Sequence, residues 1–204
     1  MFGTEDSMRE VFSRACASTD SLKMHKHLAK ALKNCSKNEE AGDVFESMLK
    51  KFKSKDLEVW YLYAEHLMEI GETSKARDLL HRAIQCLEKK HHVAVLCRFA
   101  QMEYRHGDVE RGKTMFEKIV HTYGKKTIVW TLFIDMVLKY ESIAEARKVF
   151  ERAIADNQMS SKLKIFFKKW MDAEEKFGDD ESQNLVRERA VKMVDELKQD
   201  DTSD

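Results

Sequence analysis

The sequence contains no proline and only seven glycines among its 204 residues. Proteins built from sheets and tight turns usually use more of both residue types, so helices joined by short polar links are the better interpretation. Basic and acidic residues each number 36, and the resulting net charge of zero gives no overall attraction to nucleic acid or to a membrane. No apolar run approaches the roughly 18 residues of a membrane span. The first residues also lack the basic and apolar segments of a secretion signal.

Cysteine is scarce and shows no CxxC pair. The four cysteines are Cys16, Cys35, Cys86 and Cys97. Without a secretion signal we interpret them as reduced thiols that pack as small apolar residues inside helix interfaces. Cys86, His91, His92 and Cys97 follow each other at a spacing that matches no zinc motif. We therefore predict neither a metal nor a cofactor.

A nine-residue pattern with small, large apolar and charged positions recurs five times. Its clearest copy covers residues 146–154, and further copies begin at residues 8, 41, 76 and 112. The large apolar position falls at Phe12, Phe45, Leu80, Phe116 and Phe150. The steps between these residues are 33, 35, 36 and 34 residues. A step kept through four intervals indicates a structural repeat.

A second pattern lies between these copies and ends in glycine followed by an acidic residue. Trp60, Tyr63, Ala64 and Leu67 form an apolar stripe at helical spacing, and Gly71 follows. We expect Gly71, and likewise Gly107 and Gly178, to end their helices in the left-handed conformation, with the next acid capping the following helix. The predicted repeat-core residues are Phe12, Phe45, Trp60, Tyr63, Leu80, Phe99, Phe116, Trp130, Phe133, Phe150 and Trp170.

The two patterns together predict an all-α fold, an α-α superhelix of about five two-helix repeats preceded by an unpaired first helix. The expected first helix covers residues 5–18, and the expected pairs cover 21–53, 56–88, 91–122, 126–156 and 160–198. In terms of domains, residues 1–4 are a leader, 5–198 the repeat domain and 199–204 an acidic disordered tail. The unpaired first helix suggests a longer protein whose missing part lies N-terminal, and the tail reads as a natural C-terminus.

The form Trp60-x-x-Tyr63-x-Glu65, together with the Arg-x-x-Phe-Glu-Arg-Ala run at 147–153, resembles the half-a-TPR (HAT) repeat. The resemblance covers roughly residues 5–198, although the B-helix proline of the family is missing and Leu96 and Phe167 replace its tryptophan. The runs at 98–103, 107–112 and 166–170 are also similar to the C-terminal repeats of a family of nucleolar ribosomal RNA processing proteins. That family carries tandem OB-fold RNA-binding domains before its HAT repeats.

The resemblance implies a non-catalytic scaffold in the nucleolus of the nucleus, acting in pre-ribosomal RNA processing and ribosomal subunit assembly. The implied partners are protein components of pre-ribosomal particles, with pre-ribosomal RNA as a second candidate. Neither a membrane nor a small-molecule substrate is implied. Self-association, which HAT arrays can show, stays open. The alternative is a HAT scaffold of another RNA-processing complex, in messenger RNA 3′-end cleavage or splicing.

Lysine clusters where one helix pair is expected to meet the next. The residues are Lys50, Lys51, Lys53, Lys55, Lys89, Lys90, Lys125, Lys126, Lys162 and Lys164. Equivalent junctions of a solenoid line one rim, so these lysines predict a basic strip for RNA phosphates or an acidic partner. The alternative is that lysine only favours the last turn of a helix, where it meets the negative end of the helix dipole.

Motifs of catalysis are absent from the sequence, which has no Gly-rich phosphate loop, nucleophile elbow or HExxH. The acidic pairs Glu174-Glu175 and Asp179-Asp180 adjoin a predicted helix end, and dipole capping explains them better than acid–base chemistry. We therefore expect a binding protein and no enzyme.

Overall fold

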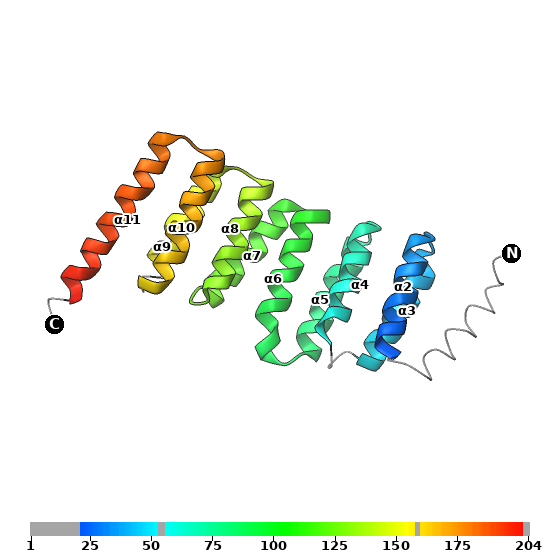
Figure 1. Cartoon of the computed structure of the whole chain (residues 1–204). Helices are drawn as coiled ribbons and strands as arrows, with labels where there is room; N and C mark the ends of the chain where they lie inside the picture. The colour runs from blue at the N-terminus through cyan, green and yellow to red at the C-terminus, as the bar shows by residue number, and fades with distance from the viewer. Residues whose placement is uncertain (1–20, 53–55, 158–159, 202–204) are drawn as a thin grey trace. The chain divides into compact units, whose positions relative to one another are not determined.

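A computed structural model describes residues 21–52, 56–157 and 160–201, and within these residues the regular secondary structure is entirely α-helical (Figure 1). The helices are α2 Ser21–Asn34, α3 Asn38–Phe52, α4 Leu57–Glu69, α5 Thr73–Cys86, α6 Lys89–His106, α7 Val109–Tyr123, α8 Thr127–Tyr140, α9 Ile143–Ala155, α10 Ser160–Phe177 and α11 Asp180–Asp201. Within the described ranges, no helix is long and apolar enough to cross a membrane.

Four of the predicted helix pairs are observed as helices that pack against each other. Contacts join α2 to α3, α4 to α5, α8 to α9 and α10 to α11, and further contacts join α3 to α4, α7 to α8 and α9 to α10. The all-α repeat architecture is thereby confirmed. The expected first helix at 5–18, including Phe12, lies outside the described residues. Helix α11 runs to Asp201, which takes three residues of the predicted disordered tail into a helix, while 202–204 also lie outside.

The chain divides into two compact units, residues 1–102 and 103–204, with the boundary inside α6. Each unit has its own core of aromatic and aliphatic side chains. Trp60, Tyr63 and Phe99 are buried in the first unit, and Trp130, Phe133 and Trp170 are buried in the second. These predicted core positions are correct. The predicted single repeat domain over 5–198 stays a prediction.

Successive repeats are joined by stacked aromatic rings. Phe45 of α3 stacks on Tyr63 of α4 with ring centroids 5.3 Å apart. The same position in α7 places Phe116 on Phe133 at 5.2 Å. In α9 it places Phe150 on Trp170 at 5.3 Å. The B helices α3, α7 and α9, each the second helix of a pair, thus contribute a ring to the following A helix, which explains the large residue at this position.

Leu80 was predicted at this same core position, and that prediction is wrong. Leu80 is half-buried, whereas its neighbour Leu79 is only 1% exposed. The buried residues of α5 are Ala76, Leu79 and Ala83, a narrow stripe at helical spacing. A leucine also lacks the flat ring by which phenylalanine stacks on the next repeat. The core position of α5 is therefore Leu79, one residue N-terminal to the predicted Leu80.

Glutamate and arginine of the B-helix pattern form ion pairs between successive repeats. Arg82 Nη1 of α5 donates to Glu46 Oε1 of α3 at 2.8 Å, and its second Nη donates to the other carboxylate oxygen at 3.0 Å. Arg152 of α9 makes the same two-pronged contact with Glu117 of α7 at 2.7 and 2.6 Å. We call these contacts the Glu–Arg ladder. Because the guanidinium fork matches a carboxylate, the ladder fixes the register of neighbouring B helices.

The turn glycines serve two different purposes. Gly71 has φ +83°, the left-handed conformation that was predicted, and in the preceding repeat Ser36 takes a similar φ of 56°. Gly107 and Gly178 are not in that conformation, so the prediction for them is wrong. A Cβ on Gly107 would lie 2.3 Å from Glu103 Oε2, and one on Gly178 would lie 2.1 Å from Glu174 Oε2. Glycine is needed there because a buried carboxylate passes close to the backbone.

Of the acidic residues that follow these glycines, two cap the next helix with a side-chain hydrogen bond and one does not. Asp108 accepts a hydrogen bond from Glu110 N at 2.9 Å, and Asp179 accepts one from Ser182 N at 2.8 Å, as predicted for caps. Glu72 makes no side-chain cap hydrogen bond and instead pairs with Lys75 at 3.3 Å. Its side chain is one methylene longer than that of the residues that cap well.

Candidate interaction surfaces

Two equivalent clefts open beside the B helices, one in each unit. The first is about 230 Å³, lies between α3, α4 and α5, and has Tyr63 and the Glu46–Arg82 pair in its lining. The second is about 430 Å³, lies between α9, α10 and α11, and has Trp170, Glu151 and Arg189 at the corresponding positions. Arg189 Nε lies 3.5 Å from Glu151 Oε2, which continues the Glu–Arg ladder into α11. Aromatic side chains beneath charged walls suit the binding of polypeptide side chains.

A buried carboxylate, Glu174, lies beneath the second cleft. It is 1% exposed and accepts hydrogen bonds from Arg147 Nε and Nη2, both at 2.7 Å, and from Trp170 Nε1 at 2.9 Å. The hydrogen bonds from Arg147 lower the pKa of Glu174, against the opposing effect of burial. A carboxylate held ionised by three donors positions a side chain and is a poor proton donor.

This geometry corrects the interpretation of Glu174 as a dipole cap. Glu174 lies in the last turns of α10, where the helix dipole disfavours a negative charge. The arginine of the preceding repeat is what stabilises it. Asp179, in contrast, does cap α11. The sequence patterns did not predict the burial of Glu174 or the Glu–Arg ladder, although the recurrence of Glu and Arg about 36 residues apart was a visible signal of the ladder.

The predicted lysines lie mostly at the starts of helices. Lys50 and Lys51 are in the last turn of α3, where the dipole alternative explains them. Lys89 and Lys90 open α6, and Lys126 is the N-cap residue of α8. Lys162 and Lys164 lie near the start of α10. At a helix N-terminus the dipole repels a cation, so the alternative fails for these residues. Lys53 and Lys55 lie outside the described residues.

Within the second unit the structure brings two lysine groups together. Lys162 Nζ donates to the backbone oxygen of Lys125 at 2.8 Å and lies 3.3 Å from Asn157 Oδ1. The α7–α8 connection and the start of α10 therefore lie at one edge of this unit, opposite the α8–α9 and α10–α11 connections (Figure 1). Lys125, Lys126 and Lys164 are exposed there. We call Lys125, Lys126, Lys162 and Lys164 the lysine edge.

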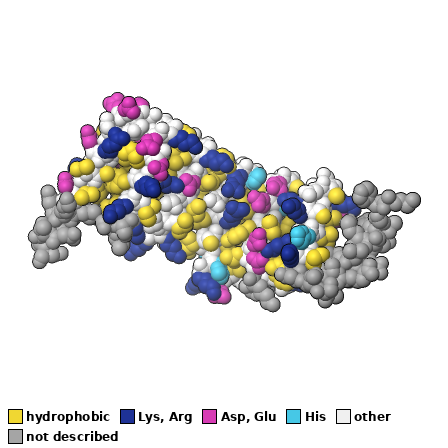
Figure 2. All heavy atoms as spheres, viewed as in Figure 1, with side chains coloured by type: hydrophobic (Ala, Val, Ile, Leu, Met, Phe, Trp, Pro, Cys, Tyr) yellow, Lys and Arg dark blue, Asp and Glu magenta, His cyan; other side chains and the backbone are white. Residues whose placement is uncertain are grey.

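In the first unit the lysines are less concentrated. Lys50, Lys51 and Lys89 are exposed, while Lys90 pairs with Glu88 at 2.9 Å. Figure 2 shows lysine and arginine interspersed with acidic side chains on the face that it presents. One continuous basic rim along all the repeats stays a prediction, because the two units are described separately.

The cysteine and histidine group occupies different environments. Cys86 is exposed at the end of α5, whereas Cys97 is buried in α6. Burial raises the pKa of the Cys97 thiol to about 11. His92 Nε2 lies 2.9 Å from the Leu87 backbone oxygen, so this ring closes the α5–α6 connection. The prediction that the cysteines pack in helix interfaces holds for Cys97 and is wrong for Cys86 and for Cys35, which is exposed. Cys16 lies outside the described residues.

Comparisons with known proteins agree with the repeat architecture. The chain is 39% identical to the rRNA biogenesis protein rrp5 of Schizosaccharomyces pombe over 96% of its length and 12% of that protein. It is 36% identical to the Protein RRP5 homolog of Mus musculus, again over 96% of this chain and 10% of the relative. The Neurospora crassa pre-mRNA-splicing factor clf-1 is 22% identical over 96% of this chain and 30% of that protein.

The chain therefore spans about a tenth of the length of the RRP5 relatives it matches. The sequence pattern of one family, described as Suppressor of forked protein (Suf), matches residues 3–129 and again 88–203. These two overlapping matches cover nearly the whole chain and agree with the resemblance to HAT repeats. The chain belongs to the Suppressor of forked protein (Suf) family of HAT-repeat proteins.

Proposed function

We propose that this chain is a non-catalytic scaffold in ribosomal RNA biogenesis, acting in pre-ribosomal RNA processing and ribosomal subunit assembly. One observation carries the proposal, the 39% identity to S. pombe rrp5 across 96% of this chain. The identity to the splicing factor clf-1 is only 22% over the same share, so ribosomal RNA processing is favoured over splicing. The proposal assigns the chain to the nucleolus and gives it protein components of pre-ribosomal particles as partners.

A chimaera tests this role directly. In S. pombe the matching region of rrp5 is replaced either by this chain or by an unrelated helical repeat array of equal length. The proposal expects this chain, but not the unrelated array, to support growth and normal levels of processed ribosomal RNA. Equal accumulation of unprocessed precursor with both inserts would contradict the assignment.

We further propose that the lysine edge contacts the phosphates of pre-ribosomal RNA. Lys126 precedes α8, and Lys162 and Lys164 lie near the start of α10, so their charges add to the positive ends of two helix dipoles. Phosphate is the ligand that helix N-termini and lysine ammonium groups both favour. In the described part of the chain, Lys125, Lys126 and Lys164 make no ion pair that would neutralise them.

Binding across a salt series tests the RNA contact. The change is Lys125, Lys126 and Lys164 to Glu, and the matched control changes the exposed lysines Lys139, Lys168 and Lys176 to Glu. Each lost phosphate contact should reduce the slope of log affinity against log salt by about 0.7 for single-stranded RNA. Only the lysine-edge variant should lose binding and slope. Equal losses in both variants would show that the edge has no special part in RNA binding.

A further inference from the structure

The B helices α3, α7 and α9 make contacts with the helix pair that follows each of them in the sequence. In α9, Phe150 stacks on Trp170 of α10, Glu151 pairs with Arg189 of α11, and Ile154 is fully buried. In α7, Phe116 and Glu117 make the same two forward contacts, to Phe133 and to Arg152. A ring, a carboxylate and an apolar residue at these positions thus form the attachment surface for a following helix pair.

Helix α11 presents the same positions uncovered. Aligning the cap residues Ser142 and Asp179 places Arg187, Glu188 and Val191 where α9 has Phe150, Glu151 and Ile154. Val191 is 61% exposed, whereas Ile154 is 0% exposed. Val194, one turn further, is 50% exposed. In repeat proteins, a face that needs no neighbour is usually polar, and the two exposed valines on this face do not fit that expectation.

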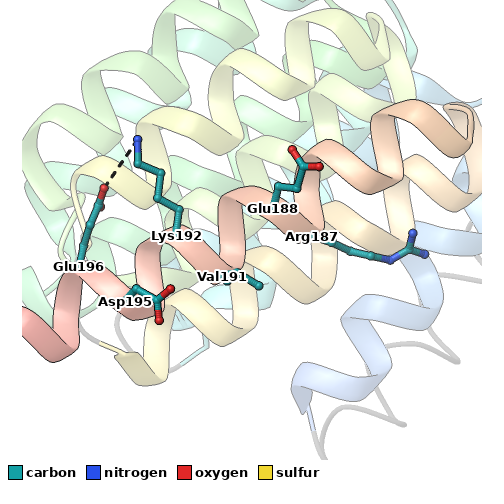
Figure 3. Close-up of a pocket in the computed structure, with 6 residues that line it drawn as sticks. All are labelled: Arg187, Glu188, Val191, Lys192, Asp195 and Glu196. Carbon is teal, nitrogen blue, oxygen red and sulfur yellow. Dashed lines mark ion pairs between the residues drawn. The ribbon is translucent and has the colours of Figure 1, made fainter.

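Two charged side chains on this face, Arg187 and Lys192, are held in place by neighbouring residues of α11. Figure 3 shows Arg187, Glu188, Val191, Lys192, Asp195 and Glu196 along a shallow depression of about 660 Å³ on α11. Arg187 is tethered to Asn184 Oδ1 at 2.7 Å, and Lys192 to Glu196 at 3.9 Å. Glu188 makes no ion pair with any residue in the described part of the chain. Its equivalents Glu46, Glu117 and Glu151 all pair with an arginine.

We infer that this face of α11 docks a helical segment of a partner protein. That segment carries an aromatic side chain over Arg187 and an arginine against Glu188. The planar guanidinium of Arg187 stacks on aromatic faces, so it can take the place of the phenylalanine ring found in the other repeats. The partner arginine completes the Glu–Arg ladder, and its apolar residues cover Val191 and Val194.

A second copy of this chain suits the face less well. Helix α11 contains no aromatic residue, so two copies packed through this face would leave Arg187 without a ring. This docking surface is separate from the lysine edge, and the inference goes beyond the proposed RNA contact. Variants of one surface leave the other unchanged, so the failure of one proposal is distinguishable from the failure of the other.

A peptide of residues 160–196 of this chain is the probe, because its Trp170 and Arg189 already make these contacts with α9. It is titrated into the 204-residue chain, and binding is followed by isothermal titration calorimetry. In the 204-residue chain, Val191→Asp should weaken binding of the probe at least tenfold. Glu188→Arg in the chain should also weaken binding, and Arg189→Glu in the probe should restore it. Ile165→Asp, at a residue 48% exposed on α10, is the matched control and should bind like the unmodified chain.

Three results would overturn the inference. Absence of probe binding would show that the face does not accept a helical segment of this chemistry. Binding unaffected by Val191→Asp would show that the probe replaces α10 and α11 and does not dock on α11. Self-association in sedimentation velocity that Val191→Asp abolishes would make a second copy the occupant. Circular dichroism of each variant confirms that the helices are retained.

Discussion

Replacing Gly178 by alanine tests whether a buried carboxylate, rather than backbone conformation, requires glycine at this turn. The new Cβ would lie 2.1 Å from Glu174 Oε2 and 2.5 Å from Ser182 Oγ. Glu174 cannot move aside freely, because Arg147 and Trp170 hold it with three hydrogen bonds of 2.7 to 2.9 Å. Losing these contacts should cost about 2–3 kcal/mol, since hydrogen bonds to a charged group are strong but Arg147 can partly rehydrate.

The assay is a double-mutant cycle with Glu174→Ala. Free energies of local opening are measured by hydrogen exchange of α10 and α11, because a chain of two units need not unfold in one step. If the carboxylate is the main obstacle, Gly178→Ala should cost clearly more free energy with Glu174 present than without it, where only the close approach to Ser182 Oγ and to the backbone oxygen of residue 174 remains. The coupling free energy should therefore exceed about 1 kcal/mol, the range found for residues in contact.

Gly71→Ala provides the contrasting case. Gly71 has φ +83° with no heavy atom within 4 Å of an added Cβ, so alanine there is strained by its backbone alone. The expected cost is about 1–2 kcal/mol.

Additive effects of Gly178→Ala and Glu174→Ala would refute the steric explanation, and Gly178 would then be an ordinary turn glycine.

Three further predictions concern burial and ionisation. Leu79→Ala should destabilise the first unit by about 2–5 kcal/mol, and Leu80→Ala by clearly less, in thermal unfolding; equal losses would contradict the shifted burial in α5. Cys86 should react with iodoacetamide in the native protein, whereas Cys97, whose pKa is raised to about 11 by burial, should react only after unfolding, as mass spectrometry can show. Because its pKa is lowered in the fold, Glu174 stabilises the protein above its unfolded pKa of about 4.3, and this contribution disappears as the pH falls through the lower folded value. Glu174→Gln should therefore lower the melting temperature at pH 7 and have little effect near pH 2.

The repeat period made most helix positions predictable. The pair expected at 126–156 is observed as Thr127–Tyr140 and Ile143–Ala155, because apolar residues at helical spacing and short polar turns mark both helices. The predicted rings Phe116 and Phe133 are buried and lie against each other. Sequence periodicity carries this information because every repeat must bury the same faces.

Features that depend on a neighbouring helix were not predictable in the same way. The burial of Leu79 instead of Leu80 depends on how α5 is rotated, and adjacent leucines satisfy either rotation. Glu174 is acidic like any solvated residue, and only the nearby Arg147 makes its burial tolerable. For the lysines, the sequence suggested the ends of B helices, whereas Lys126 and Lys162 belong to the starts of A helices. A lysine favours the C-terminal end of a helix dipole and is repelled at the N-terminal end, so an error of a few residues in the predicted helix boundary reverses the sign of the expected interaction.

The Glu–Arg ladder also bears on how such a chain can change its length in evolution. Helix α9 offers a carboxylate to its successor through Glu151 and a guanidinium to its predecessor through Arg152. Excising α8 and α9 as a block would leave Glu117 to meet Arg189, a junction of the same chemistry. Duplicating them would create another such junction. Gain or loss of this α8–α9 repeat by recombination thus preserves complementary ends, whereas a deletion that cuts within it does not.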